Sequence, residues 1–236
     1  MSELTSGFKM FERAPYKVPD SRAFTEAIID GIRGEEKIYG PFFTTTLIKY
    51  CLKAVAKTTG ENQSEDIKTL NQLTDYLLTK SNKLTMPPYF LLLWAQFVTD
   101  QKFEGFQAVG TQLMYKGLTQ RAAKSEDFEA LLKNVNVDLL LAKLRQLAVN
   151  IKVAPLEFGY KKNEDRTIDI IHGGCHFFEG CQKSSEQDLL TRPDGRMACG
   201  ATVIVCQFLK MGTNHEWDYT ILEFSEPHCV VKCFMI

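Results

Sequence analysis

The sequence has no long apolar segment and no excess of charge of either sign. Its longest apolar run, Tyr89 to Ala95, is far shorter than the roughly 18–20 residues that a membrane-spanning helix needs. The 28 Lys and Arg residues balance 29 Asp and Glu residues, and no stretch concentrates like charges as a nucleic-acid-binding arm would. We therefore expect no transmembrane segment and no nucleic-acid partner.

Several motifs of catalysis and secretion are also missing. The chain contains no phosphate-cradling glycine loop of the Walker type, no Gly-x-Ser-x-Gly elbow and no His-Glu-x-x-His pair. Its first residues lack the apolar core behind a basic start that marks a secretory signal. Seven cysteines, an odd number, argue against a disulfide framework. We expect a cytoplasmic protein whose cysteines are core thiols, metal ligands or redox sites.

What the sequence does contain is an ordinary globular composition, with 44% hydrophobic and 24% charged residues over 236 positions. That length can bury a sizeable core. Apolar residues recur at helical spacing over the first 150 residues, and short β-prone runs follow. The expected helices cover 21–33, 43–58, 64–77 (capped by Ser64), 89–101, 103–122, 126–150, 176–190 and 198–211 (stopped by Gly212). The expected strands cover 151–160, 167–174, 217–224 and 229–236.

This order predicts an α+β fold, in which an N-terminal helical region precedes a domain of helices and a small antiparallel sheet. We divide the chain into a helical extension, residues 1–101, and an α/β domain, residues 102–236. The strands are expected only in the last third of the chain. Residues 1–19 show no sustained period, so we expect a tail that drapes over the body or is loosely ordered.

Cysteine and histidine gather near the C-terminus. Cys51 and Cys206 lie among apolar residues and are expected in the core. The last 65 residues hold six cysteines and all four histidines, namely Cys175, Cys181, Cys199, Cys206, Cys229, Cys233, His172, His176, His215 and His228. Thiolate and imidazole together suit zinc, which is the functional interpretation of this cluster. The alternative is that these are buried small residues and ordinary polar side chains.

Distances limit which of these residues can share a metal ion. On a regular strand, Cys229 and Cys233 share a face but lie roughly 13 Å apart. On a helix, Cys199 and Cys206 lie about 10 Å apart along the axis. A metal site must therefore take one ligand from each of several elements. The candidate ligands are Cys199 at a helix start, Glu223 at a strand end, Cys233 in the last strand, and His228 or Cys229 in the turn.

The pattern from about Phe103 to Ile236 resembles the 4-vinyl-reductase domain family, which is similar in fold to the small TRAPP vesicle-tethering subunits. The resemblance rests on the glycine-marked segment FQAVGTQLMYKGL, on a β-hairpin before HFFEG, and on an apolar helix that Cys199 opens and Gly212 ends. A strand with a glutamate and the closing run Cys233-Phe234-Met235-Ile236 complete it.

The resemblance implies a zinc site and a ligand-binding role. In ligand-sensing members of the family, a cysteine before the helix, the strand glutamate and two later cysteines bind structural zinc. Cys199, Glu223 and Cys233 match those positions approximately. Glu226 stands where the family has a further cysteine, with His228 and Cys229 just beyond.

Three functions remain open at this point. The first is a non-enzymatic module that binds a small hydrophobic or aromatic molecule, such as a tetrapyrrole or a lipid, and acts in regulation or complex assembly. The second is a scaffold or tethering subunit that binds a protein partner and no small molecule. The third is a cysteine-dependent enzyme, in which Cys175 pairs with His172 or His176. Cys175 and Cys181 also flank His176 and Glu179, which suits a metal or a haem-like group. A homodimer is compatible with each of these functions.

Overall fold

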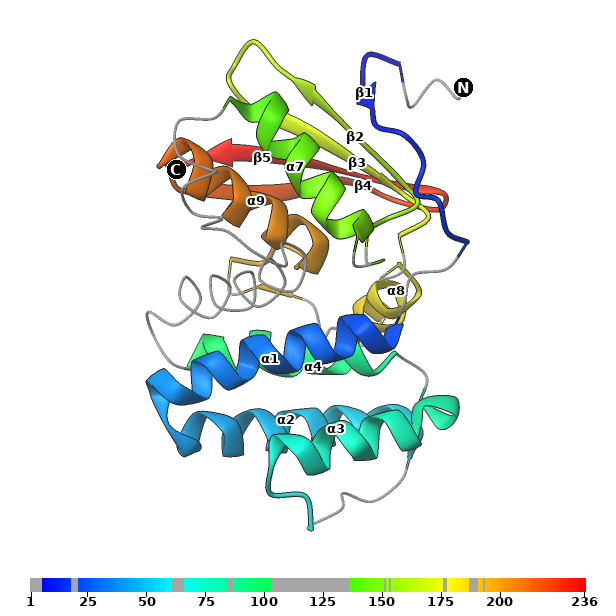
Figure 1. Ribbon diagram of the computed structural model, residues 1–236, viewed down its shortest axis with the longest axis vertical. Coiled ribbons are helices and arrows are strands. Elements are labelled where there is room, and N and C mark those ends of the chain that lie inside the picture. Colours follow the sequence, from blue (N-terminus) through cyan, green and yellow to red (C-terminus); the bar gives the residue numbers. More distant parts are fainter. Residues whose placement is uncertain are drawn as a thin grey trace.

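The computed structural model has the α+β fold expected from the sequence (Figure 1). It describes residues 6–17, 21–60, 66–84, 87–102, 136–150, 152, 154–175, 178–186, 191–192 and 194–236. A layer of helices from the first hundred residues lies below a layer that contains an antiparallel sheet and the helices packed on it. Within the described residues, no helix is long and apolar enough to cross a membrane. The helix expected over 103–122 lies outside them.

The helical layer consists of α1 (Ser21–Tyr39), α2 (Pro41–Thr59), α3 (Leu70–Thr79) and α4 (Pro88–Lys102). The predicted end of α1 at Arg33 is wrong. The helix continues because Glu35 is buried and accepts a hydrogen bond of 2.5 Å from Gln96 Nε2 of α4, so this polar run faces another helix. It ends at Gly40, whose φ of 78° suits glycine.

The start of α3 also differs from the prediction. The helix begins at Leu70, six positions after the expected cap Ser64, which lies outside the described residues. Thr69 and Gln72 form a reciprocal capping box there, in which each side chain accepts from the other residue's backbone N–H.

The sheet has five antiparallel strands in the order β1-β2-β3-β5-β4. They are β1 (Lys9–Met10), β2 (Glu157–Lys162), β3 (Ile168–Gly173), β4 (Trp217–Phe224) and β5 (His228–Met235). The expectation that strands occur only in the last third of the chain is therefore wrong. A two-residue strand is too short to show an alternating pattern, and β1 forms because β2 offers it an edge.

The helices α7 (Val137–Asn150) and α9 (Gly200–Thr213) pack on one face of the sheet, and α8 (Phe178–Glu186) lies between the two layers (Figure 1). Gly212 does not end α9 as predicted. It lies inside the helix against Leu140 of α7, where a side chain has no room. The helix instead ends at Asn214, which adopts the left-handed conformation with a φ of 56°.

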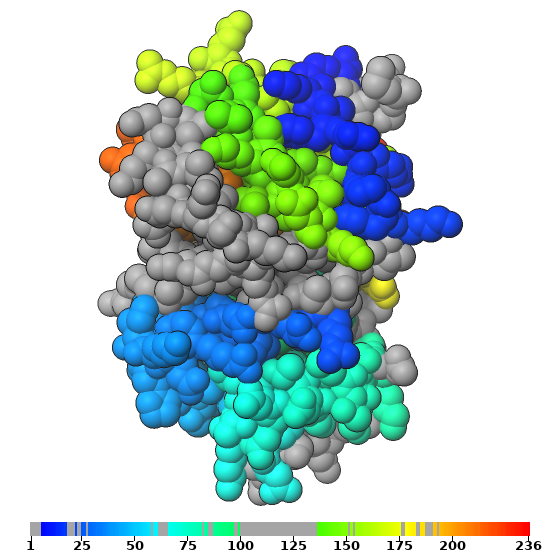
Figure 2. All heavy atoms as spheres, in the orientation of Figure 1, coloured from blue at the N-terminus to red at the C-terminus, as the bar shows by residue number. Residues whose placement is uncertain are grey.

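Arg145 of α7 anchors the N-terminal segment to the sheet. Its Nη2 atom donates hydrogen bonds to the carbonyl oxygens of Glu12 at 2.9 Å and Leu156 at 3.0 Å, and its Nη1 atom donates to Pro155 at 2.5 Å. Figure 2 shows the early residues beside α7 in the upper layer, away from α1. The segment is therefore fixed at the sheet, although it precedes the helical layer in the sequence. The division into units 1–101 and 102–236 stays a prediction.

We expect Arg145→Met to lower the free energy of unfolding by about 2–4 kcal/mol, because it removes three hydrogen bonds of a buried side chain and leaves the half-buried Pro155 carbonyl without this donor. Urea unfolding followed by circular dichroism measures the change. The matched control Arg166→Gln removes an exposed arginine from the β2–β3 turn and should change stability by less than about 0.5 kcal/mol. Equal stability of Arg145→Met and the wild type would show that this anchor is dispensable.

Candidate functional site

The metal ligands expected from the sequence divide between the two faces of the sheet. Cys229 and Cys233 of β5 project toward α7 and α9, as does the neighbouring His172 of β3. His228 precedes Cys229 and therefore points to the opposite face. Cys199 lies on the helix side as the N-cap residue of α9.

A β-bulge moves Glu223 to the face of His228. Ile221 pairs with Val231 whereas Glu223 pairs with Val230, so the register shifts between Ile221 and Glu223. In a regular strand these two residues would share a face, but the bulge places them on opposite faces of the sheet. The Glu223 carboxylate accepts a hydrogen bond of 2.7 Å from Ser225 Oγ.

His228 has its partners on this second face. Its Nε2 atom lies 2.9 Å from Glu157 Oε2, and Arg13 Nη1 lies 2.6 Å from the other carboxylate oxygen. The contact crosses Gly173, where an added Cβ would lie 2.7 Å from the imidazole. Among the described residues, no three His, Cys, Asp or Glu side chains are grouped as a metal site requires. The arrangement does not fit one zinc ion shared by Cys199, Glu223, His228, Cys229 and Cys233.

Four cysteines, from three elements and one connecting loop, approach one another where the two layers meet. Cys175 lies between β3 and α8, Cys181 lies in α8, Cys199 lies at the start of α9 and Cys229 lies in β5. We call these four residues the thiol cluster. Cys199 and Cys229 belong to the ligand set expected from the sequence. Cys175 and Cys181 appeared there only as a separate pair, because sequence spacing does not show that α8 returns to the start of α9.

An aromatic contact holds α8 beside β5. The ring centroids of Phe178 in α8 and Phe224 in β4 lie 5.0 Å apart, and Phe224 is the cross-strand partner of Cys229. Cys181 follows Phe178 by about one helical turn and so shares its side of α8. On its other side α8 packs closely on α4, where a Cβ on Gly180 would lie 2.9 Å from the ring of Phe90.

The surroundings of the thiol cluster are apolar. The core of the helical layer includes Cys181 and Ala198, and partly buried side chains from both layers pack against it. The core residues and their partly buried neighbours that are nearest in the chain to the cluster, or in the facing helix α4, are Tyr89, Phe90, Leu93, Trp94, Met197, Ala201 and Phe224. A group placed between the two layers would therefore meet thiols and aromatic rings.

Burial keeps the thiols protonated at neutral pH. Burial raises the pKa of Cys181, and the nearby Cys199, Cys175 and Cys229 raise it further. Burial likewise raises the pKa of Cys199, although its contacts with Thr202 oppose the shift. Burial and the proximity of Cys199 raise the pKa of Cys229 to about 11. An activated cysteine nucleophile needs a lowered pKa, so these shifts oppose that chemistry.

A short polar connection leads from the thiol cluster to the interior of the sheet layer. The Thr202 hydroxyl lies 3.1 Å from Cys199 Sγ and 3.5 Å from His172 Nε2. His172 is buried, and burial together with the nearby Arg145 lowers its pKa to about 4. The imidazole is therefore neutral at pH 7. The alternative partner of Cys175, His176, lies outside the described residues.

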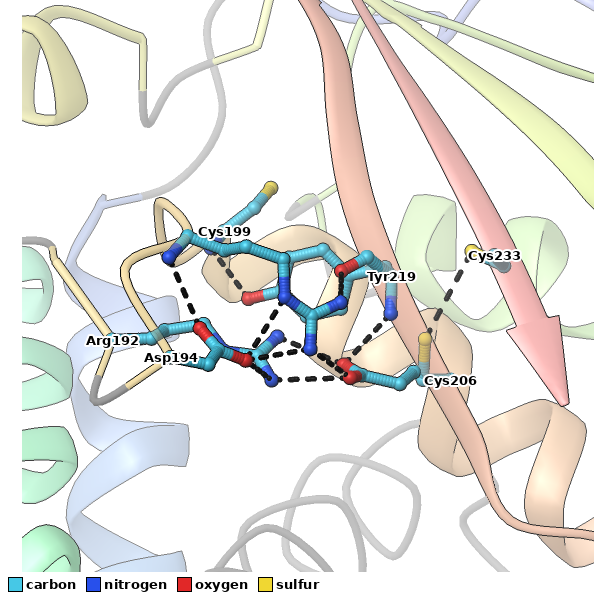
Figure 3. A network of polar contacts seen from close by, with 8 residues as sticks. Arg192, Asp194, Cys199, Cys206, Tyr219 and Cys233 are labelled. Atoms are coloured by element: carbon cyan, nitrogen blue, oxygen red, sulfur yellow. Dashed lines mark hydrogen bonds and ion pairs between the residues drawn. The ribbon is translucent and has the colours of Figure 1, made fainter. Parts of the chain in front are cut away.

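An ion-pair network holds the start of α9 against the edge strand β4 (Figure 3). Arg192 makes a bidentate contact with Asp218, with distances of 2.8 and 3.2 Å, and its guanidinium carbon lies 5.0 Å from the centre of the Tyr219 ring. Arg196 bonds to Asp194 and Asp218. The Tyr219 hydroxyl accepts the backbone N–H of Cys199 at 2.8 Å. This network therefore fixes the position of the Cys199 backbone, from which the thiol side chain extends.

The remaining cysteines lie in the two cores. Cys206 is buried, as predicted, and its sulfur lies 3.9 Å from that of Cys233 (Figure 3). Cys51 is fully buried in the helical layer, also as predicted.

The lowered pKa of His172 predicts a pH-dependent loss of stability. The His172 imidazole takes up a proton near pH 6.5 in the unfolded chain, but only near pH 4 in the folded chain, because its pKa is lowered there. Stability due to this group is therefore present above pH 6.5 and falls by about 2 kcal/mol as the pH drops to 5. We expect His172→Gln to lose less stability than the wild type over this interval in urea unfolding. Parallel profiles for the two proteins would contradict the assignment.

The hydrogen bond between Tyr219 and Cys199 predicts a second effect. We expect Tyr219→Phe to lower the free energy of unfolding by about 1 kcal/mol, because the half-buried N–H at the start of α9 loses its acceptor. The same variant should speed alkylation of Cys199 by N-ethylmaleimide, followed by peptide mass spectrometry. Tyr50→Phe in α2 serves as the control. A Tyr219→Phe protein with unchanged stability and unchanged Cys199 reactivity would show that the network does not position this thiol.

Comparisons of the chain with protein-family models, with curated proteins and with solved structures give no match. The resemblance to the 4-vinyl-reductase family stays a prediction from the sequence.

Proposed function

We propose that the chain is a non-enzymatic binding module for a small hydrophobic or aromatic molecule, with the thiol cluster as its site. The observation that carries this proposal is the approach of four thiols, from three elements and one connecting loop, at an apolar junction between two layers. Thiol groups are small and polarisable, so they pack against apolar or aromatic groups without requiring strong hydrogen bonds. Small-molecule sites commonly form where two packed units meet.

The protonation states support binding over catalysis. Burial holds the thiols of Cys181, Cys199 and Cys229 in the neutral form. A neutral thiol is a weak nucleophile but a good apolar contact. The cysteine-dependent enzyme is therefore the less favoured function.

The resemblance to the 4-vinyl-reductase family agrees with this proposal, since it implies a ligand of apolar or tetrapyrrole type and a role in regulation or assembly. The tethering function remains the alternative. It would use the surface of the helical layer, where Phe42 is 67% exposed. A ligand between the layers would be unnecessary in that case.

The proposal is tested with methyl 1-pyrenebutyrate, a neutral aromatic probe. We expect saturable fluorescence enhancement with the full chain, because the junction offers apolar and aromatic contacts. We also expect the bound probe to slow alkylation of Cys175 and Cys229 by N-ethylmaleimide, since these cluster members are only partly buried. The buried Cys233 provides the internal reference in the same mass spectra.

Two results would overturn the proposal. One is a lack of saturable binding of the probe. The other is binding that leaves the alkylation rates of Cys175 and Cys229 unchanged, which would place the probe elsewhere. A chain that binds no probe but forms a stable complex with a partner protein would favour the tethering function.

A further inference from the structure

Arg145 carries a buried positive charge that no described carboxylate balances. The side chain is 6% exposed, and its hydrogen bonds go to the carbonyl oxygens of Glu12, Pro155 and Leu156. Its Nε atom is buried and finds no hydrogen-bond partner in the part of the chain that the structure describes. An orphaned buried N–H group costs about 1–3 kcal/mol, and a buried charge costs more. The site therefore favours an acceptor that carries negative charge.

His172 presents a second orphaned atom in the same region. The residue is 2% exposed, and its Nδ1 atom has no hydrogen-bond partner among the described residues. One side of the ring lies against Phe158, with centroids 5.5 Å apart. Arg145 is close enough to oppose protonation of this ring. Two polar side chains, each more than nine-tenths buried, thus each offer an unused nitrogen atom, and Arg145 lies close enough to act on the charge of the His172 ring.

This pair connects directly with the thiol cluster. His172 and Cys229 are cross-strand partners on the helix-covered face of the sheet. On the side of α9, Thr202 Oγ1 contacts both His172 Nε2 and Cys199 Sγ. The His172 ring is therefore joined to Cys199 of the thiol cluster through one hydroxyl group.

We infer that Arg145 and His172 form a subsite for the carboxylate group of an apolar or aromatic acid whose hydrocarbon part lies along the thiol cluster. This inference rests on the proposed function. The carboxylate would accept hydrogen bonds from Arg145 Nε–H and His172 Nδ1–H. It would supply the negative charge that the buried guanidinium lacks, and a charge-assisted bond of this kind is about twice as strong as a neutral one.

The Thr202 hydroxyl lets the neutral imidazole serve this role. Its single proton can be donated to Cys199 Sγ or to His172 Nε2, but not to both at once. A carboxylate at Nδ1 requires the imidazole proton on that nitrogen, which leaves Nε2 as an acceptor. The Thr202 proton then turns from Cys199 to His172. No proton needs to enter or leave the site, so binding does not require a charged histidine.

The test compares two probes that differ only in the acidic group. We expect 1-pyrenebutyrate to bind the full chain at pH 7 at least about tenfold more tightly than methyl 1-pyrenebutyrate, measured by fluorescence titration. In His172→Gln and Arg145→Lys, the ratio of acid affinity to ester affinity, measured on the same variant, should fall most of the way to one. The control Arg166→Gln removes a positive charge outside the subsite and should keep the full difference.

The outcomes separate this inference from the proposed function. Saturable binding of the ester with equal or weaker binding of the acid would retain the apolar site and overturn the carboxylate subsite. Binding of neither probe would overturn both. If Arg145→Lys does not fold, His172→Gln decides: an unchanged preference for the acid in that variant would overturn the subsite. A preference that Arg166→Gln abolishes would assign the effect to general charge attraction and overturn it as well.

Discussion

The buried Arg145 guanidinium is the constraint on which the sheet layer depends. A single side chain of α7 satisfies carbonyl groups from the N-terminal segment and from the residues that lead into β2. These contacts tie the residues that follow β1 and the residues that precede β2 to α7. Burial lowers the pKa of the neighbouring His172, and the positive charge of Arg145 lowers it further. Fold and site are thus coupled through one cation whose hydrogen bonds go to backbone oxygens.

Burial decides the chemistry of the thiol cluster more than sulfur content does. Thiols at a surface beside a helix N-terminus or a cation would be nucleophilic and good metal ligands. Here the start of α9 is pressed between the helical layer and the sheet, and the pKa of Cys199 rises despite its contacts with Thr202. The ion pairs of Arg192 and Arg196 lie on the outer side of Tyr219, from which they fix the helix start without activating the thiol.

The amino-acid sequence was sufficient to predict the α+β order and most elements after residue 150, since the hairpins and α9 have clear periods. It could not reveal β1, because two residues show no period and their strand exists only through the edge of β2. The prediction that Gly212 ends α9 was wrong for a related reason. Its place inside α9 follows from close contact with Leu140 of α7, a tertiary cause that overrides a local helix-stop signal.

The candidate site was also mispredicted, because the sequence does not reveal the β-bulge in β4. Strict alternation along β4 would put Glu223 on the face of Ile221, beside the cysteines of β5, which is what a shared metal site requires. One extra residue in β4 moves the carboxylate to the other face, and there it shares the surface with His228 and Glu157. The bulge thereby separates oxygen ligands from sulfur ligands. The helix side keeps the thiols of Cys229 and Cys233, the neutral imidazole of His172 and the buried guanidinium of Arg145.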